Sequence, residues 1–330
     1  MCPPSLYEGN EMPGLKNGSK IGKTDLLMLM TVLLWSVNLS MIKIGLRDLS
    51  PHGFNAIRLT IASLVYLAVF ALGRGKFALV KGDGWKAVGL GILGITAYQL
   101  FFIQAISRTN ASTASVILAT SPIFIALLST VLGQERIHWA GWLGIVISIG
   151  GFFFVLASEN GGLALSGPGM RGAALIVLAN ICWAAYTVFS KPVLDRNSAF
   201  GLAALGTAAG TLLYLPFAMR DVAAIDWRRI SLPAWGAILF SGLVAIVLCF
   251  FIWYDSVQKV GSSKTGVYGN LTPIFAVVFA GIFLGEHFSA AEAAGSAVVL
   301  AGVYLTRSGY RFFERRPGAQ IPFDIRDPNS

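Results

Sequence analysis

The chain has 330 residues, of which 55% are hydrophobic and only 12% are charged. Soluble domains carry about twice that charged fraction, so this composition excludes an ordinary soluble fold and indicates a helical membrane protein. The formal net charge of +9 would suit a nucleic-acid partner, but the basic residues sit in short loops between apolar runs, as membrane topology requires. We therefore expect a lipid bilayer, and no nucleic acid, as a partner.

Ten segments are long and apolar enough to cross a bilayer, for which a helix needs about 20 residues. The predicted spans cover residues 25–46, 52–72, 86–106, 111–132, 139–157, 172–190, 199–219, 233–255, 264–285 and 289–306. The longest internal loop runs from Gly161 to Gly169 and separates two groups of five spans. We predict two five-helix units at 23–160 and 161–307, between polar cytoplasmic tails at 1–22 and 308–330.

The placement of lysine and arginine predicts that both termini lie in the cytoplasm. With the N-terminus inside, the inner segments counted up to Arg316 hold 16 basic residues, against 7 in the outer segments. Cytoplasmic loops are normally the richer in these residues, so the opposite orientation is rejected. The expected location is the inner membrane of a bacterium, which the chain crosses many times.

Two stretches of the sequence repeat each other at an offset of 151 residues, Glu135 against Glu286. Residues 120–135 read TSPIFIALLSTVLGQE, and residues 271–286 read LTPIFAVVFAGIFLGE. The proline inside each predicted helix supplies no N–H, so the carbonyls of Leu118 and Gly269 need other partners. Such a pair of breaks points to the binding site of a transporter, although proline is also tolerated as a simple kink in membrane helices.

The repeat also predicts the relative direction of the two halves. Each half holds five spans, an odd number, so the second half must enter the membrane inverted relative to the first. The predicted fold class is therefore an all-α integral membrane protein with ten transmembrane helices in two inverted five-helix repeats. In transporters of this design the substrate site lies near the middle of the membrane, where the halves meet.

The sequence resembles the EamA-type transporters of the drug/metabolite transporter superfamily. The likeness covers residues 25 to 306 and departs from the repeat at Gln134, where the second copy has Gly285. It rests on the run from Leu34 to Asn38, on Pro51, Phe54 and Arg58, on the two Pro-Ile-Phe…Glu stretches and on the run from Val260 to Thr265. The resemblance implies ten helices, two inverted repeats and the export of amino acids or other small metabolites.

Arg58 lies seven residues after Pro51, which places it about 10 Å into its helix at 1.5 Å per residue. A charge at that depth usually faces a cavity or a partner. One interpretation is that Arg58 binds a substrate carboxylate, because a guanidinium can form a bidentate pair of hydrogen bonds with a carboxylate. The other is an arginine that extends to the interface or caps carbonyls at a helix break. The second half has no matching arginine, which favours the latter.

A second charge, Asp255, lies near the end of the eighth predicted span beside Trp253 and Tyr254. Burial would raise the pKa of such a carboxyl and suit it to carry a coupling proton. Alternatively, Asp255 pairs with Lys259, one helical turn further along, at the membrane interface.

Several aromatic residues are predicted near the middle of their spans, whereas aromatic residues of the interfacial belt lie at span ends. Each of them alone is explained by packing, but aromatic walls with a few polar groups are what a small-molecule pocket needs. We expect Trp35 and Trp183 to face each other across the symmetry axis. The candidate substrate-binding residues are Trp35, Asn38, Arg58, Tyr98, Gln99, Thr120, Ser121, Trp183, Tyr186, Tyr268 and Asn270.

Three classes of function are compatible with a chain of this kind: a secondary transporter, a membrane-embedded enzyme, and a passive channel or receptor. An enzyme would need clustered acid–base or metal-binding residues, but His52, His138 and His287 lie apart at span ends. We expect no catalytic residue, no metal, no cofactor and no ATP-driven pumping. A channel does not require inverted repeats with paired breaks. The sequence predicts an exporter of amino acids or related amphipathic compounds that works by alternating access, as a monomer or weak homodimer with a small-molecule substrate.

Overall fold

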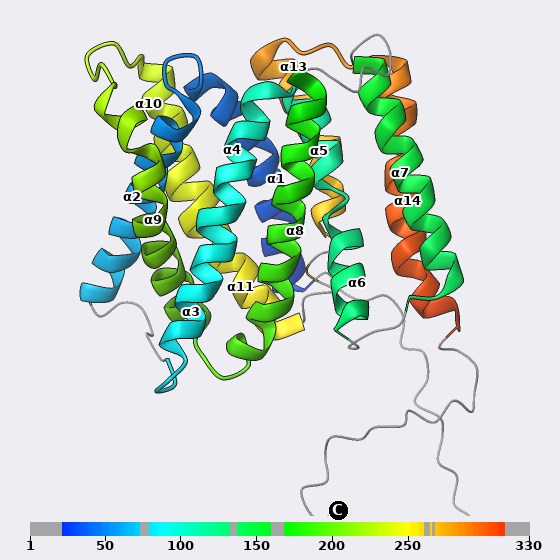
Figure 1. Cartoon of the computed structure of the whole chain (residues 1–330), viewed down its shortest axis with the longest axis horizontal. Helices are drawn as coiled ribbons and strands as arrows, with labels where there is room; N and C mark the ends of the chain where they lie inside the picture. Colours follow the sequence, from blue (N-terminus) through cyan, green and yellow to red (C-terminus); the bar gives the residue numbers. More distant parts are fainter. Residues whose placement is uncertain are drawn as a thin grey trace, which may run out of the picture.

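The computed structural model describes residues 22–72, 79–132, 137–159, 168–260, 265 and 268–313, and the regular elements in these ranges are all helices. The helices stand side by side, roughly parallel or antiparallel to one another (Figure 1). Their bounds are α1 (Lys23–Gly45), α2 (Pro51–Ala71), α3 (Gly84–Gly91), η1 (Ile92–Ala97), α4 (Tyr98–Arg108), α5 (Ala111–Leu118), α6 (Ser121–Val131), α7 (Trp139–Glu159), α8 (Pro168–Leu194), α9 (Ala199–Ala223), α10 (Leu232–Leu239), η2 (Phe240–Leu248), α11 (Cys249–Val260), η3 (Gly269–Leu271), α13 (Thr272–Leu284) and α14 (Ala290–Phe313).

The ten predicted spans are confirmed as helices. Eight stretches are long and apolar enough to cross a membrane, and two shorter apolar helices cover Gly269–Leu284 and Ala290–Thr306. Two of the eight contain an inserted segment of another helix type: Gly84–Arg108 contains η1, and Leu232–Lys259 contains η2. Both inserted segments are π-helical, and such widened turns are frequent at functional sites. They occur in the third span of each half, so the two halves share this irregularity at equivalent places.

Some features predicted from the sequence lie outside the described residues. These include Glu135, Ser262 and Lys264, the loop that begins at Gly161, and most of the two tails. The last helix, α14, continues to Phe313, so it extends into the region predicted as the C-terminal tail.

The fourth span is interrupted where the repeat places its first proline. α5 ends at Leu118 and α6 begins at Ser121, with Pro122 in the first turn of α6. The expected single helix with an internal proline is thus two segments, because proline fits the first turn of a helix, where its missing N–H costs nothing. The Ser121 hydroxyl donates to the carbonyl of Leu118 over 2.5 Å, and the Thr120 hydroxyl donates to that of Ile117 over 2.7 Å. Side chains therefore replace the missing backbone donors.

The second copy of the repeat is interrupted in a similar way. A 3-10 turn, η3, precedes α13, and Pro273 lies in the first turn of α13. The carbonyl of Gly269, which proline leaves without its usual partner, accepts the backbone N–H of Thr272. The two prolines thus mark two helix breaks at equivalent places in the two halves.

Glu286 demonstrates that the two copies run in opposite directions. It follows the end of α13, and its carboxylate accepts the backbone N–H groups of Ala111 at 2.9 Å and Ser112 at 3.0 Å. The Ser112 hydroxyl donates to the same carboxylate over 2.7 Å. The end of the second copy therefore meets the beginning of the span that holds the first. This is the antiparallel arrangement that an inverted repeat requires.

Replacing Glu286 with alanine is expected to destabilise the protein, because the carboxylate caps the positive end of α5. Loss of a helix cap typically costs about 0.5–2 kcal/mol. The measurement is the midpoint of thermal unfolding of the purified protein in detergent. Glu286→Gln, which retains one acceptor oxygen but loses the charge, should fall between the parent and Glu286→Ala. An unchanged midpoint in both variants would contradict the capping role.

A buried carboxylate joins the chain before α3 to the connection between α8 and α9. Asp83 is 3% exposed and lies 2.7 Å from the Lys86 ammonium, 3.2 Å from the Arg196 guanidinium and 2.9 Å from the Asn197 amide nitrogen. Hydrogen bonds, first from Lys86 and then from Asn197, hold the pKa of Asp83 below its ordinary value. The carboxylate is therefore ionised at neutral pH and ties this end of the helix bundle together.

Asp83→Asn is expected to lower the thermal midpoint at pH 7, because it removes that ionised acceptor. A carboxyl whose pKa is depressed by folding stabilises the protein above its unfolded-state pKa, and this contribution disappears as the pH falls through the folded-state pKa. The difference between parent and variant should therefore be constant from about pH 6 to about pH 8 and shrink below about pH 4. A difference independent of pH down to acid conditions would contradict a role for the charge.

Glycines allow the third and seventh spans to pack closely. A Cβ atom on Gly91 would lie 2.3 Å from the carbonyl oxygen of Gly206, and one on Gly210 would lie 2.5 Å from that of Gly91. Gly206 and Gly210 are spaced four residues apart, and small residues at this spacing let membrane helices approach each other closely. This contact joins the first half to the second next to η1, which leads into the residues that line the central cavity.

Candidate substrate site

A cavity of about 140 Å³ lies beside both helix breaks. Helices from the two halves build its wall, so neither repeat could form it alone. It is lined by Trp35, Asn38, Leu39, Arg58, Tyr98, Gln99, Phe102, Leu118, Ala119, Ser121, Pro122, Ile125, Trp183, Ala245, Ile246, Phe250, Trp253, Gly269, Asn270 and Thr272. The breaks contribute Ser121 and Pro122 from α6 and Gly269, Asn270 and Thr272 from the start of the ninth span.

Most of the candidate residues from the sequence meet in this cavity. Those that line it are Trp35, Asn38, Arg58, Tyr98, Gln99, Ser121, Trp183 and Asn270. They come from six different spans, so only the folding of the two repeats onto each other brings them together.

Three candidate residues do not line the cavity. Thr120 is buried, and its hydroxyl donates to the carbonyl of Ile117 and accepts from Asn180 at 3.1 Å, which stabilises the helix break. Tyr186 is 2% exposed and packs behind Trp183, at 5.4 Å between ring centroids. The hydroxyl of Tyr268 donates to Asp25 of α1. These residues support the wall or close its surroundings, because their side chains point into helix contacts rather than into the cavity.

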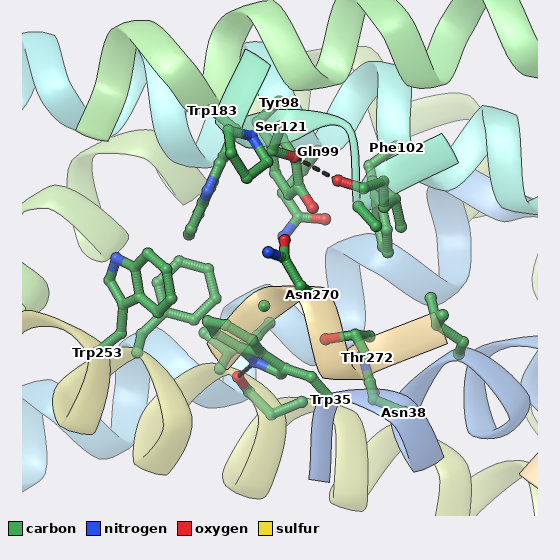
Figure 2. Close-up of a pocket in the computed structure, with 18 of the residues that line it drawn as sticks. Trp35, Asn38, Tyr98, Gln99, Phe102, Ser121, Trp183, Trp253, Asn270 and Thr272 are labelled. Carbon is green, nitrogen blue, oxygen red and sulfur yellow. Dashed lines mark hydrogen bonds between the residues drawn. The ribbon is translucent and has the colours of Figure 1, made fainter. Parts of the chain in front are cut away.

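Three indole rings form one side of the cavity (Figure 2). The rings of Trp35 and Trp183 lie 6.2 Å apart between centroids and nearly perpendicular, at 85°. Trp253 stands 5.4 Å from Trp35 and 5.6 Å from Trp183. The Trp35 indole N–H donates to the carbonyl of Ala245 over 3.0 Å, which fixes the ring and satisfies its only polar group. The cluster is an apolar wall made by both repeats.

Arg58 stands at the polar side of the cavity and is only 1% exposed. Its Nε donates to Asn55 over 2.7 Å, and its two terminal nitrogens donate to Ser241 over 2.6 Å and to Gln99 over 2.8 Å. The guanidinium also lies over the ring of Phe102, at 5.9 Å. Arg58 therefore does not extend to the interface, and these three hydrogen bonds run to side chains rather than to backbone carbonyls, contrary to the favoured interpretation of the sequence.

Two carboxamides complete the polar side. The side-chain oxygens of Asn38 and Asn270 are buried, and neither has a hydrogen-bond partner within the described part of the chain. Figure 2 shows the Asn270 side chain between the indole rings and Phe102, pointing toward Gln99. The cavity thus combines an aromatic wall with one cation and several neutral polar groups.

Sequence reasoning missed Trp253, Phe250 and Phe102 as wall residues. A signal for two of them was present, because Phe-Phe-Ile occurs at 101–103 and again at 250–252 in the equivalent spans. Trp253 lies three residues after Phe250 and therefore on the same helical face. It is 5% exposed, and its contact with Trp35 depends on how α11 approaches α1, which no local pattern encodes.

Asp255 lies away from the cavity wall. Its carboxylate accepts a hydrogen bond from the Lys259 ammonium over 2.7 Å, and its side chain is 25% exposed. This is the pairing that the sequence offered as the alternative to a coupling-proton role. Among the described residues, no group of three or more histidines, cysteines, aspartates or glutamates could hold a metal ion.

Two inverted sets of spanning helices around an amphipathic cavity define a class of protein, the multi-pass membrane transporters with internal repeats. Within that class, residues 22–157 and 170–308 each match the model of the EamA-like transporter family. Because the two matches cover most of the chain, the protein belongs to this family. It is a transporter-family protein rather than an enzyme.

Related proteins agree with this assignment, and a solved structure shares the fold. An uncharacterized transporter of Archaeoglobus fulgidus is 30% identical over 86% of this chain and 97% of its own length. A probable terminal-alkyne amino-acid exporter of Streptantibioticus cattleyicolor is 29% identical, over 92% and 99%. A probable amino-acid metabolite efflux pump of Salmonella typhimurium is 23% identical, over 88% and 96%. A crystal structure with 21% identity matches the fold with a TM-score of 0.66, over 88% of this chain and 98% of that one.

Proposed function

We propose that this protein is a secondary carrier that exports small amphipathic metabolites, with amino acids and related compounds as the expected cargo. The observation that carries the proposal is the cavity beside two equivalent helix breaks, with indoles on one side and polar groups on the other. Carriers with inverted repeats bind their cargo at such a place and expose it to each side of the membrane in turn. The names of two relatives, an amino-acid exporter and an amino-acid metabolite efflux pump, support this cargo class.

Counterflow in liposomes tests the carrier against the passive channel. Vesicles that contain the purified protein are loaded with an excess of one unlabelled neutral amino acid, and labelled amino acid is added outside. A carrier exchanges the two, so label accumulates transiently above its external concentration. A channel gives only equilibration, without an overshoot, and such a result would overturn the proposal. A panel of amphipathic compounds then identifies the preferred cargo.

We further propose that both termini lie in the cytoplasm of a bacterial cell, with the chain in the inner membrane as a monomer or weak homodimer. The basic residues support this orientation, because they are more numerous in the segments assigned to the inside. A reporter that is active only in the cytoplasm is expected to work when fused after Ser330. Activity of a periplasm-dependent reporter at that position, in place of the cytoplasmic one, would contradict the orientation.

A further inference from the structure

Within the described part of the chain, Arg58 forms no ion pair. The three groups that accept its hydrogen bonds, Asn55, Ser241 and Gln99, are all neutral. A guanidinium has five N–H donors, so two of them are not used by these bonds. The residues that line the cavity, all of which are described, include no aspartate or glutamate. A buried cation normally needs an anionic partner because burial removes its hydration, so the cavity has an electrostatic preference for a ligand that brings a negative charge.

The two asparagines provide the opposite chemistry. Asn38 is 7% exposed, and its buried side-chain oxygen, like that of Asn270, lacks a partner in the described ranges. Leaving a buried acceptor unpaired costs about 1–3 kcal/mol. Both side chains line the cavity, so a ligand that enters it with N–H donors would satisfy these oxygens. An ammonium group has three such donors and no acceptor.

We infer that the cavity contains a head-group site for a zwitterion, in which Arg58 binds the carboxylate and the side-chain oxygens of Asn38 and Asn270 accept the ammonium. The inference rests on the proposed function and gives these three residues separate roles in selecting the cargo. The apolar body of the cargo faces the indoles of Trp35 and Trp183, on the other side of the cavity.

This assignment predicts an order of affinity among compounds that share one apolar body. A zwitterion engages both parts of the head-group site. The corresponding acid without its amino group still neutralises Arg58 but leaves the two carboxamide oxygens unpaired. The corresponding amine brings a second positive charge close to Arg58, and like charges disfavour each other in a site of low polarity. The expected order is therefore amino acid, then deaminated acid, then amine.

Two matched sets of compounds test the order: leucine, 4-methylpentanoate and 3-methylbutylamine, and phenylalanine, 3-phenylpropionate and 2-phenylethylamine. Binding to the purified full chain in detergent is followed by calorimetry and by tryptophan fluorescence, independently of transport. We expect each acid to bind about tenfold more weakly than its amino acid, the loss that one good hydrogen bond to a charged group produces. The amines should not compete for binding. Counterflow of the same compounds is measured in parallel.

The variant Asn38→Leu removes one acceptor with little change in side-chain size. It should reduce the preference for the amino acid over the deaminated acid severalfold, while the acid binds as it does to the parent. Asn270→Leu should behave alike. Asn110→Leu, which alters an asparagine at the start of α5 outside the cavity lining, serves as the matched control and should keep the preference. Circular dichroism and size-exclusion chromatography establish that each variant is folded.

The outcomes separate the head-group site from the carrier proposal. If an amine binds as tightly as its amino acid, Arg58 is not the carboxylate partner. If the parent binds acid and amino acid equally, the asparagines do not hold the ammonium. If none of the compounds binds to the folded parent, the proposal of a head-group site is also contradicted. If the expected order is found in binding but no compound gives counterflow, the head-group site stands and the carrier function fails.

Discussion

Replacing Trp35 and Trp183 together by alanine is expected to impair counterflow strongly while leaving insertion into the membrane intact. The two rings form opposite halves of the aromatic wall, 6.2 Å apart between centroids. An aromatic contact contributes roughly 0.5–1.5 kcal/mol beyond the burial of area. The loss of two such contacts amounts to about 1–3 kcal/mol, which corresponds to about a fivefold to 150-fold weakening of cargo binding.

The structure supplies controls for this prediction. Trp142 in α7 is 51% exposed and lies outside the cavity, so Trp142→Ala should keep full counterflow. Trp35→Phe keeps an aromatic ring but loses the indole N–H that donates to Ala245 over 3.0 Å, and should fall between the parent and the double variant. Counterflow is compared at equal amounts of protein in the membrane. Full activity of the double alanine variant would establish that the indoles serve only packing.

The overall architecture could be predicted from the sequence because its signals are long and repeated. Ten apolar runs define the spans, and their odd number in each half requires the inversion. The Pro-Ile-Phe motifs located both helix breaks, since proline lacks the N–H that a continuous helix needs. What they did not reveal is that Pro122 begins a separate segment, α6. That outcome depends on the side chains of Thr120 and Ser121, which satisfy carbonyls of the preceding turn.

The cavity itself was only partly predictable. Depth within a span identified Trp35, Trp183 and Asn270, because residues of equal depth in paired helices converge where the repeats meet. Depth alone cannot tell which way a side chain points around a helix. Tyr268 was therefore assigned to the cavity although its hydroxyl bonds to Asp25 instead. Trp253 was overlooked although it touches both other indoles.

The contacts of Arg58 could not be predicted from the sequence. From the sequence, the absence of an equivalent arginine in the second half favoured a structural role, with the side chain extended to the interface or bonded to carbonyls. Its observed partners, Asn55, Ser241 and Gln99, come from α2, η2 and α4. Asn55 lies one helical turn before Arg58 in the same span, but Gln99 and Ser241 reach Arg58 only through tertiary packing, which no spacing within one span encodes. Because these partners are neutral, the proposed head-group site can use the positive charge of Arg58 to bind a carboxylate.

Gly91→Ala is expected to reduce the amount of folded protein and to lower its thermal stability, although alanine normally favours a helix. The added Cβ would lie 2.3 Å from the carbonyl oxygen of Gly206 and 3.1 Å from its Cα. Both atoms belong to the backbone of α9, so no flexible side chain can move aside. Helices α3 and α9 would have to separate, and overpacking of this kind typically costs about 1–3 kcal/mol. The measurement is the yield and thermal midpoint of the purified protein.

Gly89→Ala is the matched control for this substitution, since it lies in the same helix and a Cβ there meets nothing within 4 Å. Alanine is better than glycine in a helix by roughly 0.5–1 kcal/mol, so this variant should be as stable as the parent or more stable. The two substitutions are chemically identical and differ only in what the new methyl group meets. If both raise the thermal midpoint, the close contact of α3 with α9 is not present in the folded protein. If only Gly91→Ala lowers it, counterflow should fall too, because η1 follows Gly91 directly and carries the chain to Tyr98 and Gln99 at the cavity wall.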